Sequence, residues 1–223
     1  MFADRGPIAR TVAVAVLVAM GLLLLGVMVG SRVGRTGTPG DGSAEAGFLR
    51  DMATHHRQAV AMAMTMLQRT EDADIRYLAL DIATSQGTQV GTMTGWLEAW
   101  DLPLTGEGGP MAWMGDEVEG RMPGMANDER LRELETLPSA RADVLFLELM
   151  RIHHLAGVDM ARAILDRGDN ALVRELAEAI AATQSNEIAL MDAMLAERGA
   201  TADSPLPGGT PVAVPATPTD DHS

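Results

Sequence analysis

Apolar side chains recur at three- and four-residue steps along most of the chain, a spacing that places them on one face of a helix. Thr70-Glu71-Asp72 and Gly168-Asp169 interrupt this pattern, and such residues are common where one helix ends and the next begins. Ser43 and Ser139 stand at expected N-caps, because a serine oxygen accepts a hydrogen bond from a free N–H at a helix start. The predicted helices cover residues 43–69, 73–100, 127–136, 140–167 and 170–198.

The two pairs of long helices are copies of one unit. Residues 48–56 return as residues 146–154, and the same offset continues without a gap to Leu97 and Leu195. Two tandem hairpins of amphipathic helices predict an all-α four-helix bundle with pseudo-twofold symmetry. We expect this bundle over residues 44–198, made of a first repeat, 44–100, a methionine-rich crossover, 101–141, and a second repeat, 142–198.

The two ends of the chain differ from the bundle in composition. Residues 12–30 carry no charge and form a run long enough to cross a bilayer as a helix. We expect an uncleaved, single-pass transmembrane anchor with the C-terminal domain outside the cytoplasm. The alternative is a cleaved signal, with Ala44-Glu45-Ala46 as the small-x-small site and a secreted or periplasmic product. The remaining segments are a short N-terminal stretch, 1–11, a flexible linker, 31–43, and a Pro/Thr-rich tail, 199–223, that is too poor in apolar residues to fold.

Composition removes several kinds of chemistry. The chain has no cysteine, and all 17 basic residues are arginine, so thiolate sites, Schiff bases and Walker-type phosphate binding lack their usual residues. A net charge of −14 argues against a nucleic-acid partner and favours small cations near the surface. The 16 methionines are either core filling or soft thioether ligands, and their location has to decide.

Each copy carries a His-His pair with one methionine three residues before it and another seven residues after the first histidine. Neighbouring histidines on a helix point about 100° apart, so we expect one of each pair to face inward and the other to lie at a groove between helices. Imidazole with thioether and no thiolate favours copper, above all Cu(I). The candidate metal ligands are Met52, His55, His56 and Met62 in the first copy and Met150, His153, His154 and Met160 in the second.

Further polar and sulfur-bearing residues lie near the histidines on the predicted helices. Gln86, Met93, Gln184, Glu187 and Met191 are candidate hydrogen-bond partners of the histidines or additional ligands. With Glu187 and the glutamines, the histidines could instead hold Cu(II) or zinc. All of these side chains also have a simpler interpretation as core packing.

Met122 and Met125 flank Pro123-Gly124 in the crossover, and this turn sequence predicts that both are exposed. Exposed methionines have no packing reason, so we regard the pair as a candidate copper-loading loop.

The order of these motifs resembles family 305 of domains of unknown function. The resemblance rests on Phe-x-x-x-Met-x-x-His-His, a following Met-Ala, Gln-x-x-Glu-Ile with a methionine four residues on, and the Met-Pro-Gly-Met linker, and it covers about residues 46–198. It implies a ferritin-like fold in a bacterial, often exported protein, with copper binding and copper resistance among the family's roles. The first copy departs from the pattern at Gln89-Val90, where Glu-Ile is expected.

The leading hypothesis is an exported, membrane-anchored protein that sequesters copper through the histidine and methionine face. A metal-dependent oxidase is the enzymatic alternative, and a structural or adaptor bundle without metal is the third. A ferritin-type di-iron centre requires a Glu-x-x-His motif. Met52 and Met150 stand where that glutamate would be, which counts against oxygen-activating iron chemistry. The physiological protein partner is not indicated by the sequence.

Overall fold

A computed structural model describes residues 37–115, 118 and 120–200 of the chain. Within this part every regular element is helical and no strand occurs, which confirms the all-α prediction. The elements are α2 (Ala44–Arg69), α3 (Ala73–Ala99), the 3-10 helix η1 (Ala112–Met114), α4 (Asp128–Thr136), α5 (Ser139–Leu165) and α6 (Ala171–Glu197). The predicted anchor at residues 12–30 and most of the predicted tail lie outside the described residues.

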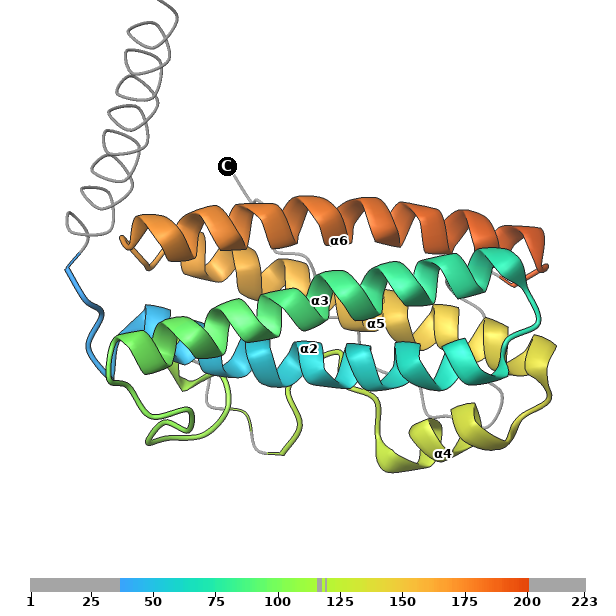
Figure 1. Ribbon diagram of the computed structural model, residues 1–223, viewed down its shortest axis with the longest axis horizontal. Coiled ribbons are helices and arrows are strands. Elements are labelled where there is room, and N and C mark those ends of the chain that lie inside the picture. Colours follow the sequence, from blue (N-terminus) through green and yellow to red (C-terminus); the bar gives the residue numbers. More distant parts are fainter. Residues whose placement is uncertain (1–36, 116–117, 119, 201–223) are drawn as a thin grey trace, which may run out of the picture.

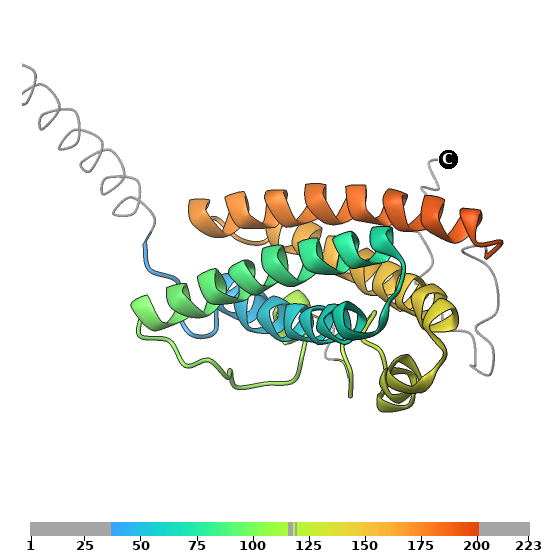
Figure 2. The same ribbon diagram turned by 45° about the vertical axis from the view of Figure 1, so that its right-hand side comes forward.

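The four long helices form two antiparallel hairpins. α2 packs along α3 and α5 packs along α6, and the two hairpins meet mainly where α2 contacts α5 (Figures 1 and 2). Each of these helices has 26 or 27 residues, so each is about 40 Å long. The crossover, with η1 and α4, contacts α2, and α4 also contacts α5.

The tight turn inside each hairpin is built the same way in both copies. Asp72 caps α3 by accepting hydrogen bonds from two backbone N–H groups, and Asn170 does the same for α6. The guanidinium of Arg76 donates to carbonyls of Leu67 and Thr70, and Arg174 makes the equivalent bonds in the second hairpin. Both copies therefore retain an arginine at this position, because its guanidinium satisfies carbonyls that are left free at the end of the preceding helix.

The two predicted serine caps have different outcomes. Ser43 caps α2, with its Oγ accepting from the Ala46 N–H at 3.2 Å, as expected. The prediction for Ser139 is wrong, because Pro138 holds the cap position of α5 and Ser139 is already the first helical residue. Its Oγ instead accepts from the Glu71 N–H at 3.2 Å, so it ties the start of the second hairpin to the turn of the first.

Apolar side chains fill the two ends of the four helices as separate clusters. One cluster combines the second half of α2 and the first half of α3 with the first half of α5 and the end of α6. The other combines the opposite halves of the same helices with buried residues of the crossover. Neither cluster includes the middle of the helices, where polar side chains are buried instead. Burial of the two apolar clusters therefore stabilises the two ends of the bundle, whereas the middle of the bundle contributes less apolar burial.

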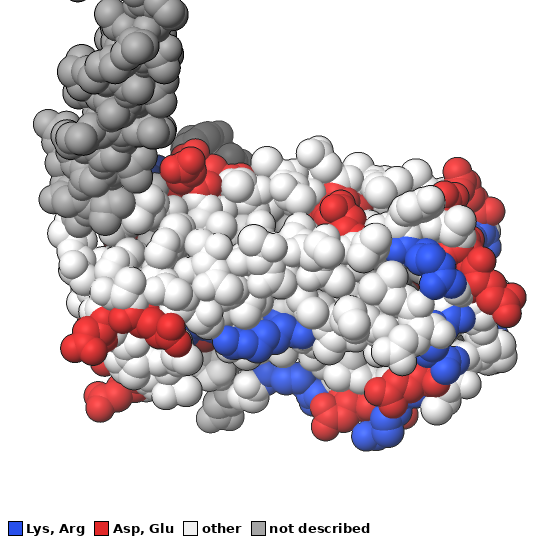
Figure 3. Space-filling model, viewed as in Figure 1, with Lys and Arg blue, Asp and Glu red and all other residues white. Residues whose placement is uncertain are grey.

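The surface over the middle of the bundle carries little charge on the side shown in Figure 3, where arginine and acidic side chains gather mostly towards the ends and one edge. Residues 82–97 of α3 contain no charged side chain at all. Among the described residues, no helix combines the length and hydropathy needed to cross a membrane.

The crossover is seated on one face of α2 by a glycine and a carboxylate. A Cβ on Gly47 would lie 2.6 Å from the Cβ of Trp113, so this glycine makes room for the indole. The Trp113 Nε1–H and the Met111 N–H both donate to the Asp51 carboxylate, at 2.9 and 2.8 Å. The second copy has Leu145 at the position of Gly47, so this docking face belongs to α2 alone.

Replacing Gly47 with alanine should lower the free energy of unfolding by about 1–3 kcal/mol, because the added methyl group displaces Trp113 from α2. Urea unfolding of the metal-free protein measures this difference. The matched control is Gly91→Ala on α3, where a Cβ meets nothing within 4 Å. That variant should be neutral or gain up to about 1 kcal/mol from helix propensity. Equal effects of the two substitutions would contradict the docking face.

Candidate metal centre

A layer of buried polar side chains crosses the middle of the bundle between the two apolar clusters. Seven of its residues are almost completely shielded from solvent, and Gln89 is half-buried. All four long helices contribute to the layer: α2 gives His55 and His56, α3 gives Gln86 and Gln89, α5 gives His153 and His154, and α6 gives Gln184 and Glu187. A polar group in such surroundings destabilises the fold unless it is hydrogen-bonded or bound to a ligand.

His55 and His153 meet face to face where α2 crosses α5. Their rings are stacked, with centroids 3.6 Å apart and planes inclined by 27°. His153 Nε2 lies 3.0 Å from the backbone carbonyl of His55, and His55 Nε2 lies 3.2 Å from the carbonyl of Pro123 in the crossover. The two histidines that the repeat makes equivalent are therefore neighbours across the pseudo-twofold axis.

His56 and His154 face the second helix of their own hairpins. His56 Nε2 lies 2.8 Å from Gln89 Oε1, and His154 Nε2 lies 2.8 Å from Glu187 Oε2. The two bonds are equivalent in the repeat, but one acceptor is a neutral amide and the other a carboxylate. All four histidines are 0 % exposed, so the groove position expected for one of each pair is itself fully buried.

The hydrogen bonds fix which ring nitrogen carries the proton. A carbonyl or carboxylate oxygen can only accept, so each Nε2 that faces one must be the N–H donor. The Nδ1 atom of each neutral ring then carries a free lone pair. In each of the four histidines Nδ1 is buried and has no hydrogen-bond partner among the described residues. A buried imidazole lone pair without a donor is the group that a metal ion can satisfy.

Burial favours the neutral form of His55, His56 and His153. Loss of solvation lowers the pKa of His55 to about 3, with repulsion from His56 adding to the effect. Loss of solvation also lowers the pKa of His56 to about 4, and that of His153 falls well below its usual value for the same reason. Neutral imidazole is the form that can bind a metal ion, and burial favours this form at physiological pH.

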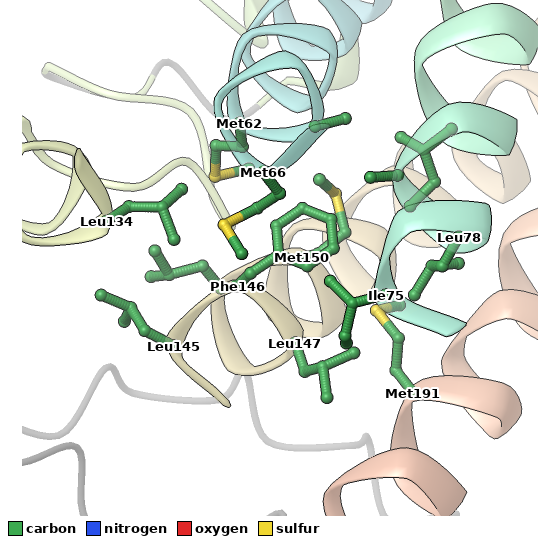
Figure 4. Close-up of a cluster of buried hydrophobic side chains, with 14 of the residues drawn as sticks. Met62, Met66, Ile75, Leu78, Leu134, Leu145, Phe146, Leu147, Met150 and Met191 are labelled. Carbon is green, nitrogen blue, oxygen red and sulfur yellow. The ribbon is translucent and has the colours of Figure 1, made fainter. Parts of the chain in front are cut away.

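The candidate methionines form two groups on the two sides of the polar layer. Each group mixes the copies, because the methionine seven residues after the first histidine packs with the other hairpin. The groups are Met52, Met93 and Met160 in one apolar cluster and Met62, Met150 and Met191 in the other, all at most 1 % exposed. Figure 4 shows the second group. Met62 and Met66 extend from α2 towards Phe146 and Met150 of α5, and Met191 reaches the same cluster from α6.

The crossover closes the layer from the side of α2. A Cβ on Gly124, which has a φ of +77°, would lie 2.9 Å from the Ile152 carbonyl, so the turn rests directly on α5. Gln58 holds Ala126, two residues further along the loop, with two hydrogen bonds: its Nε2 donates to the Ala126 carbonyl at 3.0 Å, and its Oε1 accepts from the Ala126 N–H at 2.7 Å.

The prediction that the turn exposes its methionines is wrong for Met122. Its side chain is only 5 % exposed and belongs to the apolar cluster that holds Met52, Met93 and Met160. Met125 is partly buried against the same cluster. The loop faces inward because Gln58 and the close approach of Gly124 to α5 hold it there, which turn propensity alone does not reveal.

The two glutamines of the layer differ although the repeat makes them equivalent. Gln86 Nε2 lies 3.5 Å from His154 Nε2, so Gln86 reaches across to the other hairpin. Gln184 packs over Gly157, where a Cβ would lie 2.2 Å from its Oε1, and neither polar atom of its amide has a partner among the described residues. Gln86 thus lies beside His154, but its amide N–H and the His154 Nε2–H are both donors and cannot bond to each other, and Gln184 does not bond to a histidine.

The donor set fits a soft ion better than a hard one. No three side chains of the His, Cys, Asp or Glu type converge as ligands among the described residues. A zinc site needs three or four donors of that kind. Any site built on these histidines must therefore be completed by other atoms, and thioether sulfurs flank the layer on both sides. Thioethers select Cu(I) among the biological metals.

Sequence reasoning missed three residues that shape this region: Gln58, Gly157 and Asp51. A usable signal existed, because each is a position where the two copies disagree. Gln58 corresponds to Ala156, and Gly157 corresponds to Ala59. Departures from the repeat mark the places where the crossover or an unusual packing breaks the pseudo-symmetry.

The chain is an all-α protein with two tandem helical hairpins around a buried polar layer that methionines flank. A comparison with protein families identifies the family of such proteins to which it belongs. The model of a domain of unknown function, DUF305, matches residues 45–195. The chain therefore belongs to the DUF305 family, which confirms the resemblance inferred from the motifs. A comparison with curated proteins gives no match.

Solved structures of similar proteins cover nearly the same region. A DUF305 protein from Streptomyces coelicolor, described as a candidate secreted protein, is 44 % identical, with 73 % of this chain and 98 % of that chain covered and a TM-score of 0.70. A DUF305 fragment from Deinococcus radiodurans is 35 % identical, with 69 % and 96 % covered and a TM-score of 0.59. CopM in its Cu(II)-bound form is 24 % identical, with 70 % and 97 % covered and a TM-score of 0.57. CopM is also described in Cu(I)-bound and silver-bound forms, and at this identity it shows a shared fold.

The metal-free protein should lose stability as the pH falls below about 6.5, the pKa of histidine in an unfolded chain. The folded-state pKa values of His55 and His56 lie near 3 and 4, so the unfolded chain binds protons first. His55 and His56 then each cost about 1.4 kcal/mol for every pH unit below 6.5 until their own folded pKa values are reached. Urea midpoints between pH 7 and 4.5 measure this slope.

The carboxyls of Asp51, Asp143 and Glu148, whose pKa values burial raises, act in the opposite direction and reduce the slope only at the acidic end. A folded His56→Asn variant should show a slope that is smaller by the contribution of one buried histidine, about 1.4 kcal/mol per pH unit. A midpoint that stays constant between pH 6.5 and 5 would contradict neutral, buried histidines.

Proposed function

We propose that this protein binds copper in the polar layer at the middle of its bundle and sequesters the metal outside the cytoplasm. The observation that carries the proposal is the set of four buried Nδ1 lone pairs without partners, flanked by two groups of buried methionines. Cu(I) is the favoured cargo, because nitrogen and thioether donors without a thiolate or a carboxylate cage suit a soft monovalent ion.

The comparisons support copper over other metals. CopM shares the fold and is described with Cu(I), Cu(II) and silver, and silver is a soft monovalent ion like Cu(I). Zinc and iron, which the sequence left open, would each require more nitrogen and oxygen donors than converge here. The ferritin-like description of the fold belongs to this proposal as well, with the histidine layer in the place where such bundles hold metal.

Export of the protein is part of the proposal. Residues 12–30 form an uncharged run of bilayer length, and the relative from Streptomyces coelicolor is described as a candidate secreted protein. Either a tether through this run or its cleavage would place the metal layer outside the cytoplasm. Cell fractionation of the full chain, with an antibody against the C-terminal domain, distinguishes membrane-bound, released and cytoplasmic protein.

Replacing the histidines in pairs should remove copper binding. The variants His55→Asn/His153→Asn and His56→Asn/His154→Asn keep a polar side chain of similar size in the layer. Each should lower the affinity for Cu(I) by at least about a hundredfold, since loss of a ligand weakens binding no less than loss of its hydrogen-bond partner. Competition with a chromophoric Cu(I) chelator under reducing conditions measures both affinity and stoichiometry, and circular dichroism confirms folding.

The matched control is His222→Asn, which removes the fifth histidine and should leave the titration unchanged. In the unaltered protein, free Cu(I) at a hundred times the dissociation constant should raise the free energy of unfolding by about 2.7 kcal/mol. Unchanged affinity and stoichiometry in a folded pair variant would overturn the proposed site.

Copper can reach the layer past the crossover, whose turn covers His55. Gln58→Ala removes both bonds to Ala126 and should let the loop open more often. We expect faster association of Cu(I) in stopped-flow measurements with unchanged stoichiometry. Thr65→Ala, on an exposed part of the same helix, should leave the rate as it is. An unchanged rate for Gln58→Ala would place the entry path elsewhere.

A further inference from the structure

The polar layer has two halves, the first from α2 and α3 and the second from α5 and α6, which are equivalent in geometry but not in charge. His56 in the first half and His154 in the second each donate their Nε2–H to a side-chain oxygen of their own hairpin at 2.8 Å. The acceptor is the neutral amide of Gln89 in the first half and the carboxylate of Glu187 in the second. Glu187 is only 6 % exposed, and its Oε1 has no hydrogen-bond partner among the described residues.

A buried carboxylate changes the metal affinity of a histidine in two ways. An N–H that donates to a negative oxygen makes the other ring nitrogen a stronger donor, so Nδ1 of His154 binds a cation more tightly than Nδ1 of His56. The carboxylate also neutralises the charge of the bound ion, whereas an ion beside Gln89 would be buried without a counter-charge. Both effects act in the same direction.

No arginine forms a salt bridge with Glu187 among the described residues. His154 is its one hydrogen-bonded partner, and the salt bridges of α6 that involve Asp192 and Arg198 leave Glu187 out. The carboxylate is therefore paired with an imidazole and with no guanidinium. A metal ion on Nδ1 of His154 would add a positive charge to the same buried layer.

We propose that Glu187 makes the second half of the layer the high-affinity copper site, which fills first, and that Gln89 leaves the first half as the weaker, exchangeable site. This inference rests on copper binding by the layer and adds the order in which the halves fill. The pseudo-symmetry of the bundle gives each half one His pair and one methionine group. The difference between Glu187 and Gln89 therefore determines which half binds copper more tightly. Glu187 acts as an affinity-determining residue through His154.

The test exchanges the two residues and follows binding of Cu(I), of silver as a monovalent ion without redox chemistry, and of Cu(II). Glu187→Gln should weaken the tighter binding step about 10- to 100-fold, and Gln89→Glu should tighten the weaker step by a similar factor. The double variant Gln89→Glu/Glu187→Gln should restore two unequal steps with the halves exchanged. Nitrogen NMR of labelled histidines then shows His56 responding before His154, the reverse of the unaltered protein.

Charge rather than shape is the cause in this proposal, so the loss in Glu187→Gln should be larger for Cu(II) than for silver. A purely structural role for Glu187 would weaken both ions equally. The matched control, Glu178→Gln, removes an exposed carboxylate from the same helix and should leave both steps unchanged. If Gln89→Glu fails to fold, Glu187→Gln with its ratio of Cu(II) to silver affinity decides alone.

The results separate this inference from the proposed function. Copper binding that depends on the histidines but is unaltered by Glu187→Gln overturns the inference and leaves the function standing. A single binding step in the unaltered protein overturns the division into a tighter and a weaker half, even where Glu187→Gln weakens that step. Absence of copper binding in the unaltered protein removes the function and the inference together.

Discussion

Four histidines buried at mid-length are the constraint on which the rest of this bundle depends. Polar groups removed from water destabilise a fold unless they are paired, and here only half of the ring nitrogens are paired. The Nε2 atoms are held by two backbone carbonyls, an amide and a carboxylate. The remaining lone pairs are retained in a layer between two apolar clusters that supply the stability. In the proposed function, a bound cation would offset this cost and stabilise the fold.

Duplication explains how such a layer forms from a short motif. Each copy contributes one His pair, and the pseudo-twofold arrangement stacks His55 on His153 and mixes methionines of the two copies on either side. The single crossover then breaks the symmetry, since it can cover only one of the two equivalent faces. Gly47, Asp51 and Gln58 on α2 hold it there, and the corresponding positions of α5 carry other residues. A symmetric arrangement of histidines and an asymmetric cover over them thus come from one duplicated sequence.

Much of this arrangement could be predicted from the sequence, because helical periodicity and a 98-residue repeat are strong, local signals. The helices begin and end within two residues of the expected positions, and His, Met and Gln residues of both copies do lie around one layer. The inward turn of Met122 could not be predicted, since it depends on a long-range clamp by Gln58. The mixing of Met62 with Met150 and of Met160 with Met52 depends on how the hairpins cross, which no local pattern encodes.

The proposed copper site depends on Nδ1 of each buried histidine, which has no hydrogen-bond partner among the described residues and would bind the cation through its lone pair. Nitrogen NMR of the histidine-labelled, metal-free protein at neutral pH measures the tautomer of each ring directly, and addition of silver shows which nitrogen responds. We expect all four rings to carry the proton on Nε2 and their Nδ1 resonances to shift as silver binds. Rings protonated on Nδ1, or Nδ1 resonances that do not move with saturating silver, would contradict it.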